Sequence, residues 1–128
     1  MKELNCDLHI IGGALTGLLT AYCAASIGLK IVISEKKNIT FNNKELLKDT
    51  RTTAIAEGSK LFLDSQGLWK FIKNFAEPIK HIKVVDTTVS SNLNFYNPKT
   101  KSNPNSNLGY IIKNSKLISV LIKELKKK

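Results

Sequence analysis

The sequence predicts an α/β fold, because a strand, a glycine turn, a helix and a second strand follow one another near its start. Residues 6–11 are mostly apolar and lead directly into Gly12 and Gly13, which predicts a buried strand ended by a tight turn. Apolar side chains then recur at three- and four-residue steps up to Gly28, the pattern of an amphipathic helix with a glycine C-cap. Residues 30–34 contain a β-branched run and predict the second strand. A crossover helix makes neighbouring strands parallel, so we expect a Rossmann-like βαβ unit with a parallel sheet.

The middle of the chain adds helices and strands to this unit. Residues 36–50 are largely polar and predict a surface loop or a short irregular helix. The apolar spacing over residues 53–75 predicts helix, which Gly67 divides into two short helices. Two further runs, residues 79–86 and 93–96, predict an antiparallel β-hairpin added on the side of the sheet.

The last part of the sequence predicts a loop, a strand and a helix. Residues 97–107 are rich in Asn, Ser, Pro and Lys, as loops are, and residues 108–112 predict one more strand. Asn114 is placed to cap a final helix whose leucines recur at four-residue spacing, at Leu117, Leu121 and Leu125. With 128 residues and 42% apolar content, the chain suits one domain with a hydrophobic core.

The charge balance is strongly basic but does not point to a nucleic-acid surface. Twenty basic residues against ten acidic ones give a formal net charge of +10, and every basic residue except Arg51 is a lysine. Nucleic-acid surfaces typically use arginine for bidentate contacts and aromatic side chains for stacking, and this chain lacks that combination. We therefore expect no nucleic-acid partner and attribute the excess charge to compositional drift towards Lys and Asn.

The cysteines, histidines and hydropathy indicate neither a metal site nor a membrane span. Cys6 and Cys23 lie seventeen positions apart without a CxxC motif, and His9 and His81 have no clustered partners. Residues 10–29 carry no charge, but their four glycines and several hydroxyl side chains argue against a spanning helix. We expect no metal, no signal peptide and a cytoplasmic location, with the inner face of the membrane as an alternative.

The glycine turn has the spacing of a dinucleotide-binding fingerprint. Gly12 suits the tight turn, Gly17 lets the helix pack closely on the strand, and Ala14 lies where a pyrophosphate approaches. The N-terminal amides and the positive dipole end of the following helix favour an anion. Glu35 comes twenty-three positions after Gly12, at the end of the second strand, where a carboxylate binds a ribose and repels a 2′-phosphate. These residues favour FAD or NAD over NADP.

The same residues also have purely structural interpretations. The glycines can serve only to pack the backbone, and the Ala14 methyl group would press on a pyrophosphate. Arg51 can pair with a diphosphate or hydrogen-bond to a ribose, or it can form a surface ion pair with Asp49 or Glu57.

Three blocks of the sequence occur in the order and spacing of a known family. The first comprises residues 7–18, 28–30 and 33–36, with the glycine turn and Glu35. The second, Asp49-Thr50-Arg51-Thr52-Thr53-Ala54-Ile55, matches an Asp-x-Arg-x-x-Ala-Ile segment and continues through residues 59–69. The third is residues 108–117, which lead into the final helix. Together they resemble FAD-dependent aromatic-ring monooxygenases, specifically the ubiquinone-biosynthesis hydroxylases, over nearly the whole chain.

The resemblance implies that FAD is the cofactor. The residues of the glycine turn would face its pyrophosphate, Glu35 would hold the adenosine ribose, and Arg51 would lie against the cofactor. The implied FAD-binding residues are Gly12, Gly13, Ala14, Gly17, Glu35 and Arg51. Enzymes of this family hydroxylate an aromatic quinone precursor with NAD(P)H and oxygen as co-substrates. The resemblance assigns no catalytic residue in this chain.

The chain also departs from the family. Ala14 replaces the usual middle glycine, Ile118 stands where an arginine is common, and the later flavin motifs and most of the substrate domain are absent. The resemblance thus implies that residues 1–128 are the N-terminal FAD-binding portion of such an enzyme, incomplete and not catalytic alone. Its partners would be a separate chain supplying the remaining domain, or a quinone-pathway complex at the membrane. A non-catalytic dinucleotide-binding remnant and a basic nucleic-acid or membrane-surface binder remain as alternatives.

Overall fold

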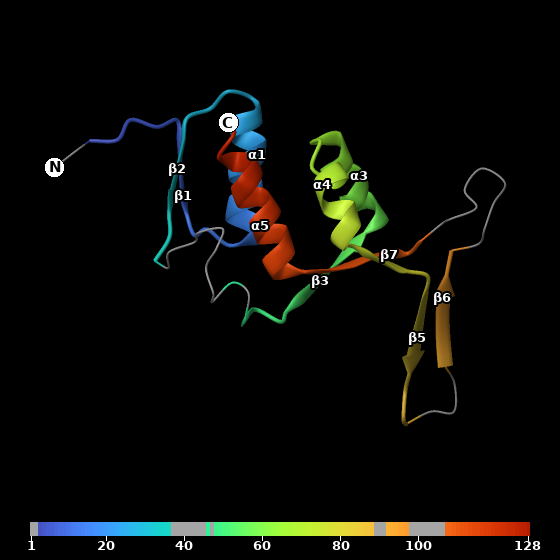
Figure 1. Cartoon of the computed structure of the whole chain (residues 1–128). Helices are drawn as coiled ribbons and strands as arrows, with labels where there is room; N and C mark the ends of the chain where they lie inside the picture. The colour runs from blue at the N-terminus through green and yellow to red at the C-terminus, as the bar shows by residue number, and fades with distance from the viewer. Residues whose placement is uncertain (1–2, 37–45, 47, 89–91, 98–106) are drawn as a thin grey trace. The chain divides into compact units, whose positions relative to one another are not determined.

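The computed structural model describes residues 3–36, 46, 48–88, 92–97 and 107–128 of the chain (Figure 1). It is a mixed α/β structure that divides into two compact units. The first unit joins Met1–Arg51 to Lys113–Lys128, and the second unit comprises Thr52–Ile112.

The first unit is built on a pair of parallel strands. Strand β1 (Leu8–Ile11) pairs with β2 (Ile31–Ser34), in register from Leu8 opposite Ile31 to Ile11 opposite Ser34. Helix α1 (Leu15–Ser26) connects the two strands and contacts both. Exposed and half-buried residues alternate along β1, as expected for a strand covered on one face. The βαβ unit expected from the sequence is confirmed, with a sheet of two strands.

Helix α1 ends in a Schellman motif at Gly28. The N–H of Leu29 donates to the carbonyl of Ala24 at 3.2 Å, and the N–H of Gly28 donates to that of Ala25 at 3.1 Å. Gly28 has a φ of +89°, a conformation that residues with a side chain rarely adopt. The glycine therefore ends the helix and turns the chain into β2, as the sequence predicts.

Helix α5 (Asn114–Leu125) packs beside α1, and the two helices supply the core of the first unit (Figure 1). The buried apolar residues are Leu18, Ala21 and Tyr22 of α1 with Leu117, Ile118, Val120, Leu121 and Ile122 of α5. The predicted cap is displaced by one residue, because Lys113 occupies the N-cap position, and its side chain makes no capping hydrogen bond. The backbone N–H of Asn114, the first helical residue, donates to the carbonyl of Arg51 at 3.0 Å.

The described residues of the second unit form a three-stranded sheet, two short helices and a hairpin. Strand β7 (Gly109–Lys113) lies between β3 (Thr52–Ala56) and β4 (Glu77–Ile79) and runs antiparallel to β4. The helical segments are α3 (Glu57–Ser65), α4 (Trp69–Ile72) and a 3₁₀ turn at Lys73–Phe75. The buried apolar residues are Ile55, Leu63, Leu68, Trp69, Ile72 and Ile112.

Strand β3 corrects the prediction of helix over residues 53–75. Thr52, Thr53 and Ile55 are β-branched, and burial alternates along the strand, as it does where one face packs on a core. Its pairing partner β7 comes far later in the chain, so tertiary pairing overrides the local helical pattern. The predicted break at Gly67 is confirmed, since its φ of +70° separates α3 from α4.

Strands β5 (His81–Val85) and β6 (Asn92–Tyr96) form the expected antiparallel hairpin. They make a two-stranded sheet of their own, so the predicted position on the side of the parallel sheet is wrong. Residue 79, expected to begin the hairpin, instead ends β4. Strand β4 contains Pro78, which is tolerated because β4 is an edge strand of its sheet.

Most of the two predicted loops, residues 36–50 and 97–107, lies outside the described residues. The uncharged stretch of residues 10–29 forms the end of β1, the glycine turn and the twelve-residue α1. Within the described ranges, no helix has the length and apolar character needed to cross a bilayer.

Candidate functional site

The glycine turn joins β1 to α1 and begins at Gly12. This residue has a φ of +107°, which favours glycine because a side chain would be strained there. Its N–H donates to the carbonyl of Ser34 at 2.8 Å, so the pairing of β1 with β2 continues into the turn. The carboxyl ends of the two parallel strands therefore lie side by side, where ligands bind in open α/β sheets.

Gly17 lies in the first turn of α1 and lets the helix approach the strand. A Cβ atom at Gly17 would overlap the carbonyl oxygen of Gly12 and lie 3.3 Å from Cγ2 of Ile10. The obstacle is backbone, so rotation of a side chain could not relieve the overlap. Both outer glycines of the fingerprint are thus required by the geometry of the turn itself.

Ala14 occupies the N-cap position of α1. Its backbone is extended, its side chain is exposed, and a methyl group offers no capping hydrogen bond to the helix. The first turn also contains no acidic residue. The helix start therefore presents its backbone N–H groups and the positive end of its dipole without a cap from its own N-cap residue, an arrangement suited to an anion.

Glu35 follows β2 and reaches back to the turn. Its Oε2 accepts a hydrogen bond from the backbone N–H of Gly13 at 2.7 Å. The structure thus brings five of the six predicted residues into one neighbourhood, because Glu35 is bonded to the turn that contains Gly12, Gly13, Ala14 and Gly17. The spacing in the sequence predicts that Glu35 lies near the turn, but not this hydrogen bond.

Arg51, the sixth predicted residue, is held by Asp49. Its Nε and Nη2 donate to the two carboxylate oxygens of Asp49, each at 2.9 Å. These hydrogen bonds are the main reason that the pKa of Asp49 lies below, and that of Arg51 above, its usual value. The Arg51 side chain is 78% exposed and that of Asp49 only 14%, so a ligand can still reach the guanidinium.

The structure therefore shows the ion-pair alternative for Arg51, with Asp49 and not with Glu57 as its partner. Within the described part of the chain, Arg51 is hydrogen-bonded to Asp49, and its carbonyl accepts from the backbone N–H of Asn114. Glu57 pairs with Lys60 at 2.8 Å. None of these contacts joins Arg51 to the glycine turn.

The histidines and cysteines hold structural positions. His9 and Ser34 are hydrogen-bonded across the two parallel strands at 2.7 Å, and His81 pairs with Asn94 across the hairpin at 3.1 Å. Both cysteines are free thiols, and burial raises the pKa of Cys23. The described residues contain no cluster of three metal-binding side chains.

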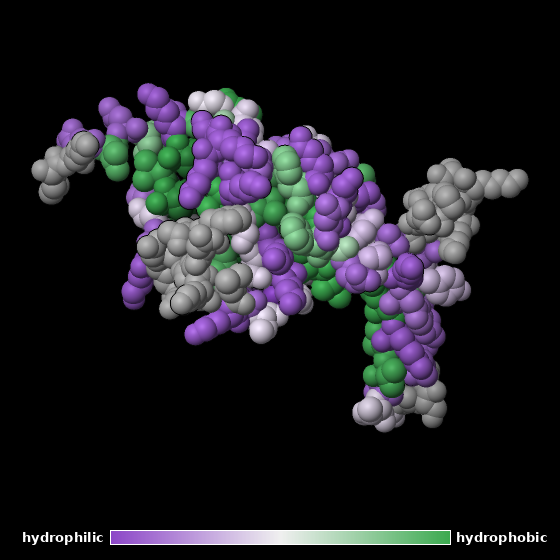
Figure 2. All heavy atoms as spheres, in the orientation of Figure 1, coloured by the Kyte–Doolittle hydropathy of each residue, from purple (hydrophilic) through white to green (hydrophobic). Residues whose placement is uncertain are grey.

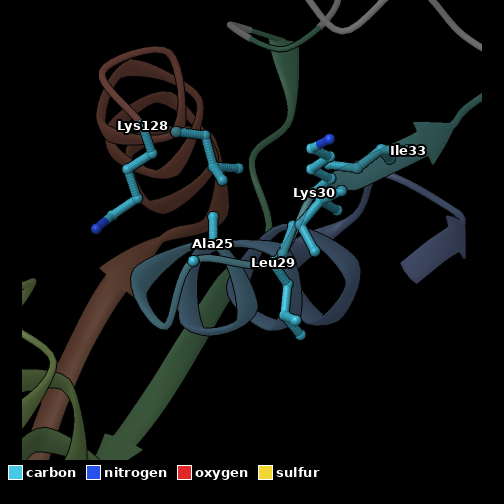
Figure 3. A pocket seen from close by; sticks show the side chains of 9 residues that line it. Ala25, Leu29, Lys30, Ile33 and Lys128 are labelled. Carbon is cyan, nitrogen blue, oxygen red and sulfur yellow. The ribbon is translucent and has the colours of Figure 1, made fainter. Parts of the chain in front are cut away.

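A hollow of about 600 Å³, which the sequence does not reveal, lies between α1, β2 and the end of α5 (Figure 3). It is lined by Ala21, Ala25, Gly28, Leu29, Lys30, Ile31, Ile33, Leu125 and Lys128. The lining is mostly small or aliphatic, and the Lys128 ammonium lies 4.8 Å from the centre of the Tyr22 ring. The hollow is at the C-terminal end of α1, away from the glycine turn at the opposite end.

Two curated proteins are similar to nearly all of the chain. The ubiquinone hydroxylase UbiM of Neisseria meningitidis serogroup C is 28% identical over 114 residues, which is 88% of this chain and 24% of that protein. The ubiquinone hydroxylase UbiL of Rhodospirillum rubrum is 28% identical over 122 residues, which is 93% of this chain and 27% of that protein. No family model matches the chain. The expected resemblance to the ubiquinone-biosynthesis hydroxylases is confirmed, and the chain spans about a quarter of the length of these relatives.

Proposed function

We propose that the chain binds FAD and forms the Rossmann-like, FAD-binding part of a flavoprotein monooxygenase that hydroxylates an aromatic ubiquinone precursor. The observation that carries this proposal is the glycine turn at the carboxyl ends of β1 and β2, with Glu35 bonded to Gly13 at its side. The positive φ of Gly12 and the close approach at Gly17 are the features by which such turns fit a dinucleotide. The similarity to two ubiquinone hydroxylases supports the reaction class.

The residues of the turn fit the diphosphate of a dinucleotide. The backbone N–H groups at the start of α1 would donate to the phosphate oxygens, helped by the helix dipole. The Ala14 methyl group is exposed at this helix start, so a small shift of the ligand or of the turn can accommodate it. Glu35 would accept hydrogen bonds from the adenosine ribose and repel a 2′-phosphate, which favours FAD or NAD over NADP.

Arg51 would act by exchanging partners. Its two hydrogen bonds to the Asp49 carboxylate have the geometry by which a guanidinium binds a diphosphate. Because the Arg51 side chain is exposed, a diphosphate can replace Asp49 as its partner. FAD, when bound, supplies the redox chemistry, with NAD(P)H and oxygen as co-substrates. The residues of this chain would bind and orient the cofactor, and they include no assigned catalytic group.

An FAD titration of the purified chain, followed by flavin fluorescence with NAD as competitor, tests the proposal. The informative variant is Ala14→Asp, because aspartate is a good N-cap and adds negative charge where the diphosphate would lie. We expect the helix cap to stabilise the fold by about 0.5–2 kcal/mol. We expect FAD affinity to fall at least about tenfold through charge repulsion. Loss of binding would then not be a result of unfolding.

Ala14→Ser is the matched control, since serine caps the helix without a charge. It should raise the urea midpoint as Ala14→Asp does and retain most of the FAD affinity. Equal FAD affinity in the wild type and both variants would place the cofactor elsewhere and reject the assignment. Stronger binding of NAD than of FAD would reject the flavin.

Arg51→Ala tests the sixth residue. If the guanidinium contacts the cofactor, its removal should weaken FAD binding by about 1.5–3 kcal/mol, the range for a charged hydrogen bond. Arg51→Lys should recover only part of this loss, because lysine lacks the bidentate geometry. Unchanged affinity in both variants would remove Arg51 from the site.

Turnover separates the monooxygenase from a non-catalytic dinucleotide-binding protein. Because the chain covers about a quarter of each relative, we propose that hydroxylation needs further polypeptide, such as a separate chain that supplies the remaining domain. NAD(P)H oxidation that depends on FAD and on this added polypeptide would support the enzyme. FAD binding that never leads to NAD(P)H oxidation, whatever polypeptide is added, would favour the non-catalytic alternative.

A further inference from the structure

The β5–β6 hairpin is a ribbon with two chemically different faces. Residues opposite each other in an antiparallel pair share a face, and successive residues alternate between faces. Ile82 opposite Phe95 and Val84 opposite Leu93 therefore form one face, which is entirely apolar. The other face contains the pairs His81 with Tyr96, Lys83 with Asn94 and Val85 with Asn92. Figure 2 shows apolar and polar residues on different sides of the hairpin.

The apolar face has no cover within the described part of the chain. Ile82, Val84, Leu93 and Phe95 are between 42% and 62% exposed, and every residue of both strands is exposed. A two-stranded ribbon is only marginally stable in water unless its apolar face packs on something. Exposed apolar faces of this kind mark places where another surface binds.

We propose that this apolar face inserts into the interface of a bilayer that contains anionic lipids. The chain has a net charge of +10, carried mainly by lysines, so it is drawn to an anionic surface. The apolar face itself carries no charge, and Lys83 belongs to the opposite face. The hairpin could therefore bury its apolar side chains while the Lys83 ammonium stays in water. The proposal concerns a surface separate from the glycine turn and does not depend on FAD binding.

The size of the face favours a lipid surface over a protein partner. A stable protein–protein interface buries more than about 1,000 Å² with good complementarity, whereas this face offers four partly exposed side chains. Shallow insertion into a bilayer needs less apolar area when electrostatic attraction adds to it. A second copy of the chain would bring its own charge of +10 to the contact, which disfavours pairing.

Adjacent residues of β6 provide a matched pair of reporters. Phe95 lies on the apolar face and Tyr96 on the polar face, and both are exposed. The variants Phe95→Trp and Tyr96→Trp are mixed with phosphatidylcholine vesicles that contain phosphatidylglycerol and brominated acyl chains. We expect bromine to quench the tryptophan of Phe95→Trp strongly and that of Tyr96→Trp weakly. The wild type, with buried Trp69, supplies the baseline.

Vesicle sedimentation then measures how much the apolar face contributes. Ile82→Ser with Phe95→Ser should weaken partitioning into the anionic vesicles about tenfold, since two apolar side chains lose their burial. Val85→Ser with Tyr96→Ser removes an aliphatic and an aromatic side chain from the other face of the same strands. This control should partition within about twofold of the wild type, and the wild type should bind neutral vesicles far more weakly.

Three outcomes would overturn the proposal. One is that the wild type does not bind the anionic vesicles. Another is binding that the two double variants weaken equally, which would mean that the lysines act alone. The third is self-association in solution that Ile82→Ser with Phe95→Ser abolishes, without specific quenching of Phe95→Trp in vesicles, which would assign the face to a second copy.

Discussion

The glycine turn and the β5–β6 hairpin differ in how far other residues of the chain pack against them. In the turn, the positive φ of Gly12, the close approach at Gly17 and the N–H of Gly13 are all accommodated by residues within the first unit. In the hairpin, backbone pairing is complete over five residue pairs, yet every residue of both strands is exposed. The first unit thus supplies the contacts that the turn needs. In the hairpin only the backbone pairing is satisfied, and the side chains stay exposed.

The difference shows that regular secondary structure and burial are separate requirements. The hairpin satisfies its backbone through β5–β6 pairing but leaves apolar area in water. In the first unit, by contrast, α1 packs on the strands and on α5 and buries Leu18, Ala21 and Tyr22. Substitutions in the two regions should therefore differ in their effects on stability even where the residue types are the same.

The largest effect is expected for Gly17→Ala. The new Cβ would overlap the backbone of Gly12, so β1 and α1 must separate, at about 4 kcal/mol or more. Gly58→Ala is the control, because a Cβ there meets nothing within 4 Å and alanine favours helix. It should leave stability unchanged or raise it by up to about 1 kcal/mol. Urea unfolding measures both, and equal midpoints for the two variants would contradict the close packing of the turn.

A pair of leucine truncations compares the two regions directly. Leu18 of α1 is 4% exposed, whereas Leu93 of β6 is 62% exposed. Leu18→Ala should lower the free energy of unfolding by about 3 kcal/mol. Leu93→Ala should change it by less than about 0.5 kcal/mol, because the side chain is already largely in water. A comparable loss for Leu93→Ala in urea unfolding would show that the hairpin face is covered in the free chain.

The smallest effects concern two aspartates with lowered pKa values. Hydrogen bonds from Arg51 lower the pKa of Asp49, and hydrogen bonds from Thr88 lower that of Asp86. Because each folded-state pKa lies below the ordinary value of 3.8, the ionised carboxylates stabilise the fold above that pH. This contribution is lost as the pH falls through the lowered pKa. Asp49→Asn and Asp86→Asn should therefore lower the urea midpoint slightly at pH 7, and this effect should shrink as the pH falls below 3.8.

Salt distinguishes the two aspartates. Asp49 pairs with a cation, so high salt should shrink the effect of Asp49→Asn. Asp86 accepts hydrogen bonds from the neutral N–H and hydroxyl groups of Thr88, so the effect of Asp86→Asn should persist. Equal salt responses in urea unfolding would show that the charge of Arg51 contributes little to its pairing with Asp49.

The parts of the fold predicted correctly are those specified by local residues. Gly12, Gly28 and the apolar periodicity between them indicate the βαβ unit, since each acts on its immediate neighbours. Strand β3 was missed because Ala54 and Ala56 favour helix, and its partner β7 lies far away in sequence. Strand β4 is not among the predicted strands, because its central residue is Pro78, which a strand tolerates only at the edge of a sheet.

The candidate site also combines features that the sequence predicts with features that only the structure shows. The spacing of Gly12, Gly17 and Glu35 follows from the βαβ geometry, so the sequence predicts that they lie together. The spacing in the sequence does not decide whether Arg51 pairs with Asp49 or with Glu57. In the structure it pairs with Asp49. The hollow beside β2 involves α5, which lies about eighty residues further along the chain, so no local pattern could reveal it.

The hydrogen bond from Gly13 to Glu35 also makes the turn preorganised. A carboxylate 2.7 Å from a turn amide restrains the ends of both strands before any ligand arrives, so less conformational entropy remains to be lost on binding. The amide hydrogen of Gly13 should therefore exchange slowly with solvent, although it lies outside helix and strand. Its exchange rate, measured by NMR, gives the chain a reporter at the glycine turn that needs no flavin, and Glu35→Gln should speed it up.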